Sequence, residues 1–231
     1  MIKPNKKYLF INLIFILLLS FTSFGQLLKV KVNKNKVYQT IEGFGASDAW
    51  RCQFVGENWS LKKRENIAQL LFSKEKDNKG NPKGIGLSIW RFYIGAGTTE
   101  QGENSNIRNE WRRSESFLNA EGNYDWTKQK GQQWFLNKAK KYGVDKFLAF
   151  SISSPVQWTK NGKGYNGNNK DGEINLKAEH FDDYAQFMIE FLKYFKSKGI
   201  SFDYLSPINE PQWDWEKKSQ EGTPATNANI L

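Results

Sequence analysis

A short motif near the end of the chain carries residues that could perform acid–base chemistry. Asn209, Glu210 and Pro211 follow directly after an apolar run, and Trp213 and Trp215 come next. In enzymes built on a β/α barrel, a carboxylate at the C-terminal end of a strand points into the active site. Tryptophan rings that exclude water from one side of Glu210 would favour its protonated form, which could then donate a proton to a departing oxygen. The residues alone leave a simpler interpretation open, in which Glu210 and Pro211 begin a helix.

Other common catalytic groups are scarce. The 231 residues include one histidine, His180, and one cysteine, Cys52. These numbers disfavour zinc chemistry and a histidine-dependent triad, and a single thiol cannot form an intramolecular disulfide. The 9 Trp, 9 Tyr and 17 Phe are a heavy aromatic content, and exposed rings are one kind of surface that binds sugars. We therefore expect chemistry carried by carboxylates, with no cofactor and no metal.

The basic character of the chain does not by itself indicate a polyanionic partner. The formal net charge is +10, but the lysines are dispersed over faces opposite the apolar stripes of the expected helices. This pattern favours a solvated surface, and we expect no nucleic-acid binding. Gly95, Ala96 and Gly97 lack the third glycine of a nucleotide fingerprint and open a long loop, so they are weak support for phosphate binding.

The first 25 residues have the pattern of a secretory signal peptide. Three lysines stand near the N-terminus, an apolar run fills residues 8–19, and small residues lead to Gly25 and Gln26. The run is shorter than the ~20 residues that a helix needs to cross a bilayer. A cleaved signal is therefore favoured over a retained anchor. We expect a secreted or periplasmic protein, cleaved near Gly25–Gln26, with no stable membrane association afterwards.

After the signal, strand and helix patterns alternate. Residues 28–41 favour a hairpin-like extended segment. The expected strands are 40–44, 85–92, 146–151 and 202–208, and the expected helices are 60–73, 125–142 and 181–198. This order predicts a parallel sheet with right-handed crossovers. Long loops follow the C-terminal ends of strands, where barrel enzymes build their sites, so we favour a (β/α)8 TIM barrel over an open doubly wound sheet.

Five ordered motifs resemble glycoside hydrolase family 30, and within it the endo-β-1,6-galactanase-like branch. They are IEGFGASDAW at 41–50, GLSIWRFYIGAG at 86–97, NEWRR at 109–113, SSPVQWTKNG at 153–162 and LSPINEPQW at 205–213. The likeness extends over essentially the whole chain after the signal. It implies a retaining glycosidase on a (β/α)8 barrel with a small β side domain. The expected domains are 1–25 (signal peptide), 26–40 (N-terminal β segment) and 41–231 (first half of the catalytic barrel).

The resemblance also implies roles for single residues. Glu210 matches the general acid/base, Asn209 a contact to the sugar 2-hydroxyl, and Arg91 an arginine that supports the catalytic carboxylates. The other candidates for substrate contact are Asp48, Trp50, Trp158 and Trp213. A structural role stays open for Arg91 and for these four residues. The cluster of Trp111, Arg112 and Arg113 could line an outer subsite or pack onto the barrel.

The sequence departs from the family in one respect. The family's nucleophile is a Glu at the end of the seventh barrel strand, and this sequence reaches only the fourth. We therefore expect an incomplete barrel of about four βα units, inactive as given, and unstable, oligomeric or aggregation-prone because its edge strands are open. The expected ligands are β-linked polysaccharides or glycan side chains. β-1,6-Galactan is favoured over β-1,6-glucan, glucuronoxylan and glucosylceramide, and the alternative is a non-catalytic glycan-binding or inert truncated relative.

Overall fold

The computed structural model describes residues 29–167 and 172–230, so the expected signal peptide lies outside the described residues and stays a prediction. Two units make up the chain, residues 1–41 and residues 42–231. In the first unit, residues 29–41 are exposed and contain one turn, closed by a hydrogen bond from the Lys36 N–H to the Asn33 carbonyl (3.1 Å). No strand is formed between residues 29 and 41, so the hairpin-like pairing predicted there is wrong. Alternate valines in this segment are all exposed, and no apolar face stabilises a two-stranded ladder.

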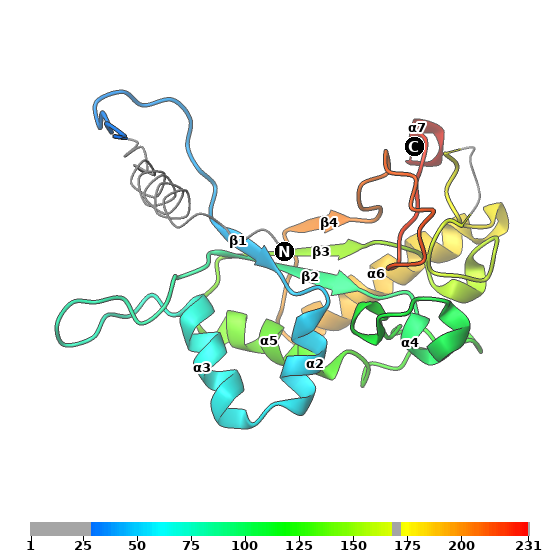
Figure 1. The fold of residues 1–231 in the computed structure, drawn as a ribbon, viewed down its shortest axis with the longest axis horizontal. Helices are drawn as coiled ribbons and strands as arrows, with labels where there is room; N and C mark the ends of the chain where they lie inside the picture. The colour runs from blue at the N-terminus through cyan, green and yellow to red at the C-terminus, as the bar shows by residue number, and fades with distance from the viewer. Residues whose placement is uncertain (1–28, 168–171, 231) are drawn as a thin grey trace, which may run out of the picture. The chain divides into compact units, whose positions relative to one another are not determined.

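In the second unit, four parallel strands form one sheet in the order β1-β2-β3-β4 (Figure 1). The strands are β1 (Gly45–Ser47), β2 (Ile89–Ile94), β3 (Lys146–Ser151) and β4 (Tyr204–Ser206). Each strand pairs with the next along the chain. Trp90 stands in register with Ala46 on one side and Phe147 on the other, and Leu205 pairs with Ala149. The predicted α/β fold with a parallel sheet is confirmed.

Helices connect the strands on one side of the sheet (Figure 1). The α-helices are α2 (Arg51–Asn58), α3 (Leu61–Phe72), α4 (Thr98–Gln101), α5 (Lys130–Lys141), α6 (Phe181–Ser197) and α7 (Asn227–Ile230). Short 3-10 turns are η1 (Gly102–Ser105), η2 (Glu110–Arg112), η3 (Val156–Trp158) and η4 (Ala178–His180). None of the helices in the described ranges is both long and apolar enough to span a bilayer.

The start of α5 differs from the prediction for a local reason. α5 begins at Lys130 and not at 125, because Asp125 accepts hydrogen bonds from the N–H and hydroxyl of Thr127 (2.9 and 2.6 Å) and so forms a separate turn. The short helix α7 begins at Asn227. Its cap is a reciprocal pair: the Thr226 hydroxyl accepts from the Asn229 N–H (3.3 Å), and Asn229 Oδ1 accepts from the Thr226 N–H (3.0 Å).

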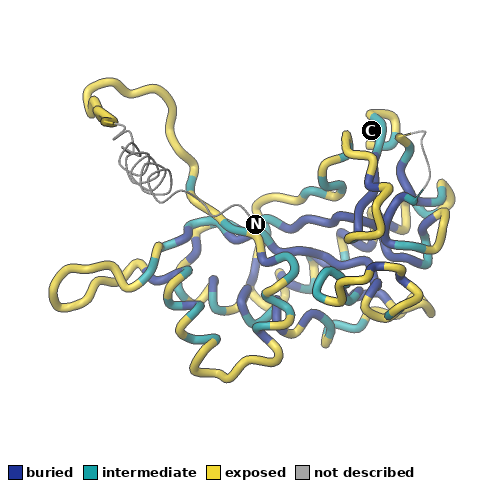
Figure 2. The backbone as a smooth tube through the Cα atoms, in the orientation of Figure 1, coloured by how far each residue is buried: buried dark blue, intermediate teal, exposed yellow. Residues whose placement is uncertain are grey.

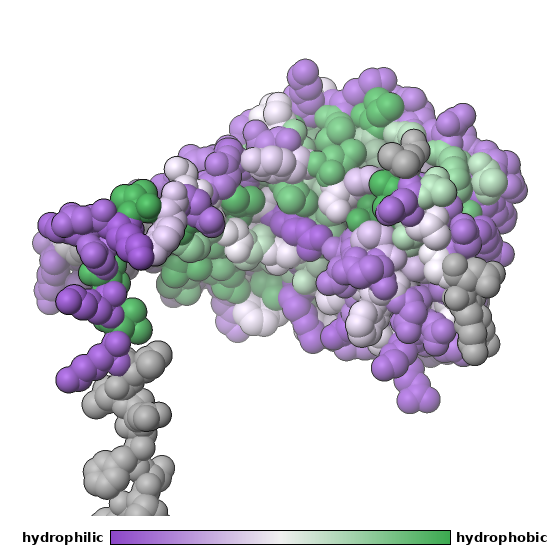
Figure 3. Space-filling model, turned by 90° about the horizontal axis from the view of Figure 1, so that it is seen from above, coloured by the Kyte–Doolittle hydropathy of each residue, from purple (hydrophilic) through white to green (hydrophobic). Residues whose placement is uncertain are grey.

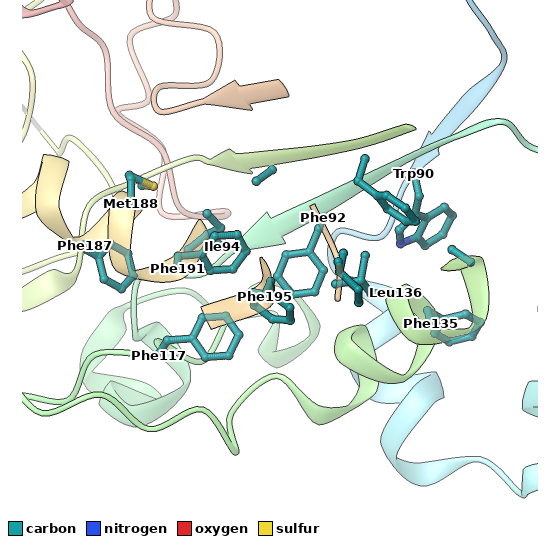
Figure 4. Packing of buried hydrophobic residues seen from close by; sticks show 14 of the residues in the cluster. Trp90, Phe92, Ile94, Phe117, Phe135, Leu136, Phe187, Met188, Phe191 and Phe195 are labelled. Atoms are coloured by element: carbon teal, nitrogen blue, oxygen red, sulfur yellow. The ribbon is translucent and has the colours of Figure 1, made fainter. Parts of the chain in front are cut away.

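The face of the sheet that meets the helices carries the main core. On β2, Trp90, Phe92 and Ile94 all point to this side, as the period of two requires (Figure 4). They pack against two helices and the loop before α5, through Phe135 and Leu136 of α5, Phe187, Met188, Phe191 and Phe195 of α6, and Phe117. Figure 2 shows the result: the middle strands β2 and β3 are largely buried, whereas residues 74–83 in the connection to β2 are exposed.

The opposite face of the sheet corresponds to the interior of a barrel. The intervening residues Tyr93 of β2 and Phe150 of β3 lie here, with ring centroids 5.2 Å apart. They form a second, smaller apolar cluster with Ile152 and Trp215. The alternation of β2 therefore places Arg91 and Tyr93 on the inner face, and barrel enzymes build their active sites at the C-terminal end of this face.

An apolar groove of about 490 Å³ lies where α6, β4 and α7 meet. Its walls include Met188 and Ile189 of α6, Leu205 of β4 and Ile230 of α7. Figure 3, seen from the side on which β4 and α7 lie in Figure 1, shows hydrophobic side chains gathered among polar ones. In the described sheet β4 has a neighbour on one side only, so both its edge and this groove are uncovered.

Candidate active site

Glu210 lies just beyond the C-terminal end of β4, and its backbone is unusual. Its φ of 49° is in the left-handed region, which residues other than glycine rarely adopt. The Glu210 carbonyl accepts two hydrogen bonds, from the Trp213 N–H (3.0 Å) and from the Trp215 indole Nε1–H (3.1 Å). The Glu210 side chain is exposed, and Trp213 is 58% exposed. The water-excluding wall predicted around this carboxyl is therefore absent from the described residues.

Arg91 and Asn209 meet beside Glu210. The Arg91 Nη2 donates to Asn209 Oδ1 at 2.6 Å, and the guanidinium lies 3.3 Å from the ring centroid of Phe150. Partial burial lowers the pKa of Arg91, and the nearby carboxylates of Asp48 and Glu210 oppose that shift. With its oxygen held by Arg91, the Asn209 amide has its NH₂ group left to donate to another partner. This geometry brings together three residues that the sequence singled out.

Asp48 follows β1 and is fully buried. Its Oδ1 accepts the Tyr93 N–H (2.8 Å), which ties the end of β1 to β2, whereas its Oδ2 has no hydrogen-bond partner among the described residues. Burial raises the pKa of Asp48 to about 8, and the Gln132 side chain, the Tyr93 N–H and the Arg91 charge lower it only in part. The same burial, with the Asp48 charge, raises the pKa of the Cys52 thiol, so this cysteine is unsuited to act as a thiolate.

Trp50 and Trp111 are each packed against other side chains. Trp50 meets Tyr93 edge-on at 6.4 Å, and the Arg112 guanidinium lies 5.0 Å from its ring. Trp111 contacts the Phe54 ring at 4.0 Å and the Arg51 guanidinium at 4.3 Å. These contacts support the packing role that the sequence left open for Trp111.

The two remaining tryptophan candidates lie in different surroundings. Trp158 stacks on His180 (5.5 Å) and meets Phe187 edge-on (6.3 Å), so it belongs to the helix side of the sheet. Trp213 lines an open hollow of about 590 Å³ together with Asp214 and Glu216. Of these two rings, only that of Trp213 is available beside Glu210 for stacking on a ligand.

The structure also assigns importance to an acid that sequence reasoning passed over. Glu221 is completely buried and joins four donors, which we call the Glu221 cluster: Tyr93, Ala96, Thr98 and Ser114. Oε2 accepts from the Tyr93 hydroxyl and the Ala96 N–H (3.1 Å), and Oε1 from Thr98 Oγ1 (2.5 Å) and Ser114 Oγ (2.6 Å). Tyr93 could have been found from the sequence, because it shares a strand face with Arg91. Glu221 could not, because it follows no strand pattern.

Neither buried acid is free to act as a second catalytic carboxylate. Both oxygens of Glu221 are occupied, and Asp48 is held beneath the surface by β2. In the described part of the chain, no three His, Cys, Asp or Glu side chains lie close enough together to hold a metal ion. What the site can offer is one exposed carboxyl, an amide donor and a guanidinium at one strand end.

The sequence profile of O-Glycosyl hydrolase family 30 matches residues 27–231. The chain belongs to glycoside hydrolase family 30. It is 26% identical over 200 residues to an endo-beta-1,6-galactanase of Hypocrea rufa, an alignment that covers 79% of this family 30 chain and 40% of the relative.

Solved structures share the fold of this chain. A conserved exported protein from Bacteroides fragilis is 44% identical, with a TM-score of 0.80 over 86% of this chain and 40% of that one. The catalytic domain of GH30 xylanase C from Talaromyces cellulolyticus, at 23% identity, shares the fold with a TM-score of 0.56 over 84% of this chain and 41% of that one. The family 30 chain thus spans about 40% of the length of the relatives it matches.

Proposed function

We propose that this chain is the acid/base-bearing part of a secreted, retaining glycoside hydrolase that cleaves β-1,6-linked galactan. The observation that carries the proposal is the 2.6 Å bond between Arg91 and Asn209, which sets Glu210 and its neighbours together at the C-terminal end of the sheet. Barrel enzymes build their active sites at this end. Family membership supports glycosidic chemistry, and the Hypocrea rufa galactanase supports the linkage. Export is supported by the basic and apolar N-terminal pattern and by the exported Bacteroides fragilis relative.

In the proposed mechanism Glu210 protonates the departing sugar oxygen and later deprotonates the attacking water. The Asn209 NH₂ group donates to the sugar 2-hydroxyl, a contact that strengthens as positive charge develops at the sugar ring. Arg91 holds the Asn209 oxygen so that the NH₂ faces the sugar. Trp213 offers a ring face to a neighbouring sugar unit. A retaining reaction also needs a nucleophilic carboxylate ~5–5.5 Å from the acid, and we assign it to a residue outside those described.

The test uses protein expressed from the complete open reading frame and β-1,6-galactooligosaccharides as substrate. Glu210→Ala is expected to lower turnover by about 10²–10⁴-fold, the usual contribution of general acid–base catalysis. Azide, which needs no general base, should restore activity with aryl galactosides that carry a good leaving group, and a β-galactosyl azide should form. The control is Glu179→Ala, an exposed acid in η4 that is not among the residues lining the hollow beside Trp213. Turnover of β-1,6-glucan or xylan in preference to galactan would contradict the substrate, and an active Glu210→Ala would contradict the role of Glu210.

A second candidate function rests on the exposed ring of Trp213, which suits a glycan-binding module without catalysis. Affinity electrophoresis in gels containing β-1,6-galactan separates the two. Retardation of the protein that is lost in Trp213→Ala, with no turnover of any oligosaccharide, would favour binding alone. Turnover abolished by Glu210→Ala would favour the hydrolase.

A further inference from the structure

The backbone of Glu210 is held by the loop that follows it. A non-glycine residue at φ 49° keeps that conformation only where surrounding contacts fix it. Here the Trp215 indole N–H reaches back to the Glu210 carbonyl at 3.1 Å. This hydrogen bond links a buried ring to the backbone of the residue whose carboxyl we assign to proton transfer.

The Trp215 ring is itself fixed on several sides. It is 8% exposed and packs with Tyr93, Phe150 and Ile152 on the inner face of the sheet. Its backbone carbonyl accepts the Asn166 N–H at 3.1 Å, which ties the loop after β4 to the loop after β3.

Gly222 and Glu221 complete the support of the Trp215 ring. The ring covers Gly222 so closely that a Cβ there would stand 2.2 Å from it. The preceding residue, Glu221, is anchored by the four donors of the Glu221 cluster. The Gly222 N–H also donates to the Gly164 carbonyl at 2.7 Å. The ring that holds Glu210 is thus seated on residues locked to the loops after β2 and β3.

We propose that Trp215 is a positioning residue for proton transfer: its indole N–H fixes the backbone of Glu210 and so aims the carboxyl at the departing oxygen, while Glu221 anchors the ring. The proposal rests on the acid/base role of Glu210 proposed above. Both residues are buried, and in this proposal each acts through Glu210. A carboxyl displaced by about 1 Å loses proton transfer but leaves binding of the sugar intact.

The test is the dependence of the rate on the leaving group, measured as kcat/KM with protein from the complete open reading frame. The phenolate of phenyl β-1,6-galactobioside needs a proton as it leaves, whereas the 2,4-dinitrophenolate of the corresponding substrate leaves without one. Trp215→Phe is expected to lower kcat/KM for the phenyl substrate about ten- to hundred-fold and to leave the dinitrophenyl value near the parent's. Glu221→Gln should show the same selective loss.

The matched control is Trp90→Phe. Trp90 is a buried ring whose Nε1–H has no partner among the described residues, so this change removes the same atoms and no hydrogen bond. It should leave the ratio of the two substrates unchanged. If Trp215→Phe does not fold, replacement of Trp215 by benzothienylalanine removes only the N–H and gives the same test.

The outcomes separate the inference from the function on which it rests. A selective loss in Trp215→Phe and Glu210→Gln, but not in Trp90→Phe, supports both. If Trp215→Phe lowers kcat/KM equally for both substrates, or for neither, the positioning role is overturned. The proposed function still holds in that case if Glu210→Gln loses activity selectively on the phenyl substrate. If Glu210→Gln is not selective, or the parent turns over neither substrate, the proposed function fails and the inference fails with it.

Discussion

Two buried acids in this protein have different surroundings, and the difference determines what each contributes. Glu221 has four hydrogen-bond donors for its two oxygens, and they offset part of the desolvation that raises its pKa. Among the described residues, Asp48 accepts one hydrogen bond, from the Tyr93 N–H, and its Oδ2 accepts none. A buried carboxylate with so little compensation holds its proton, because desolvation penalises the charged form.

Asp48 should therefore make stability depend on pH. Its pKa is about 8 in the folded protein and ~3.9 when unfolded, so the folded state binds more protons between these values. Its contribution to the free energy of unfolding is complete below about pH 4 and is lost as pH rises towards 8, by at most ~1.4 kcal/mol per pH unit. Asp48→Asn cannot titrate and should flatten this slope, as urea unfolding at pH 5 and pH 7.5 would show.

The control for this prediction is Asp145→Asn, which removes an exposed aspartate paired with Lys74. It should keep the parent's slope between the two pH values. An equally steep slope in Asp48→Asn would mean that another group carries the pH dependence.

At the scale of elements, the sequence located those whose patterns are local. β3 spans 146–151 as predicted, and α6 shows the i, i+3, i+4 stripe that packs on the sheet. α2 was not predicted, since its eight residues bury only Gly56. β4 is shorter than the predicted 202–208 because it pairs only with Leu148–Phe150 of β3.

The candidate site, too, could be predicted from the sequence only in part. The motifs indicated Arg91, Asn209 and Glu210, which the fold brings together across 118 residues of sequence between Arg91 and Asn209. No pattern could show that Trp158 packs with α6, or that the Trp215 N–H points back to Glu210. Such directions depend on contacts between distant loops, which a single sequence does not display.

α2 packs against α5 at very short range. A Cβ on Gly131 would lie 1.9 Å from the Gln53 carbonyl oxygen, and one on Gly56 would lie 2.2 Å from the Gly131 carbonyl oxygen. Gly131→Ala should force the two helices apart and lower the free energy of unfolding by ~1–3 kcal/mol, the usual cost of overpacking. Urea unfolding measures the change.

Lys130→Ala, at the exposed neighbouring position, is the control for this helix crossing. It should have little effect, because alanine is a good helix former and no packing is disturbed. If both variants unfold at the parent's urea concentration, the close approach of α2 and α5 is not as tight as the structure indicates.

At the scale of the whole molecule, the sheet leaves apolar surface uncovered. In the described sheet β4 has an open edge, and the groove beside it is lined by Leu205, which is 38% exposed. Open edges and apolar grooves of this kind promote association between chains. We predict that the 231-residue chain, purified alone, forms oligomers or aggregates, and that Leu205→Lys raises its monomer fraction. Size-exclusion chromatography with light scattering measures both.

Ile85→Lys provides the comparison, because Ile85 is an exposed apolar residue before β2 and lies outside the groove. It should leave association unchanged. A clean monomer with a cooperative thermal transition for the parent chain would contradict the prediction, whatever Leu205→Lys does.

The partners of Glu221 and of its loop are all synthesised before Glu221 itself. Every donor to Glu221 precedes it in the sequence, from Tyr93 to Ser114, and Gly164 and Asn166 also come before the loop that they fasten. When residue 222 has left the ribosome, all the partners that this loop requires are already outside. The loops after β2, β3 and β4 can therefore lock together through these contacts as soon as Gly222 is available, without any residue that follows it.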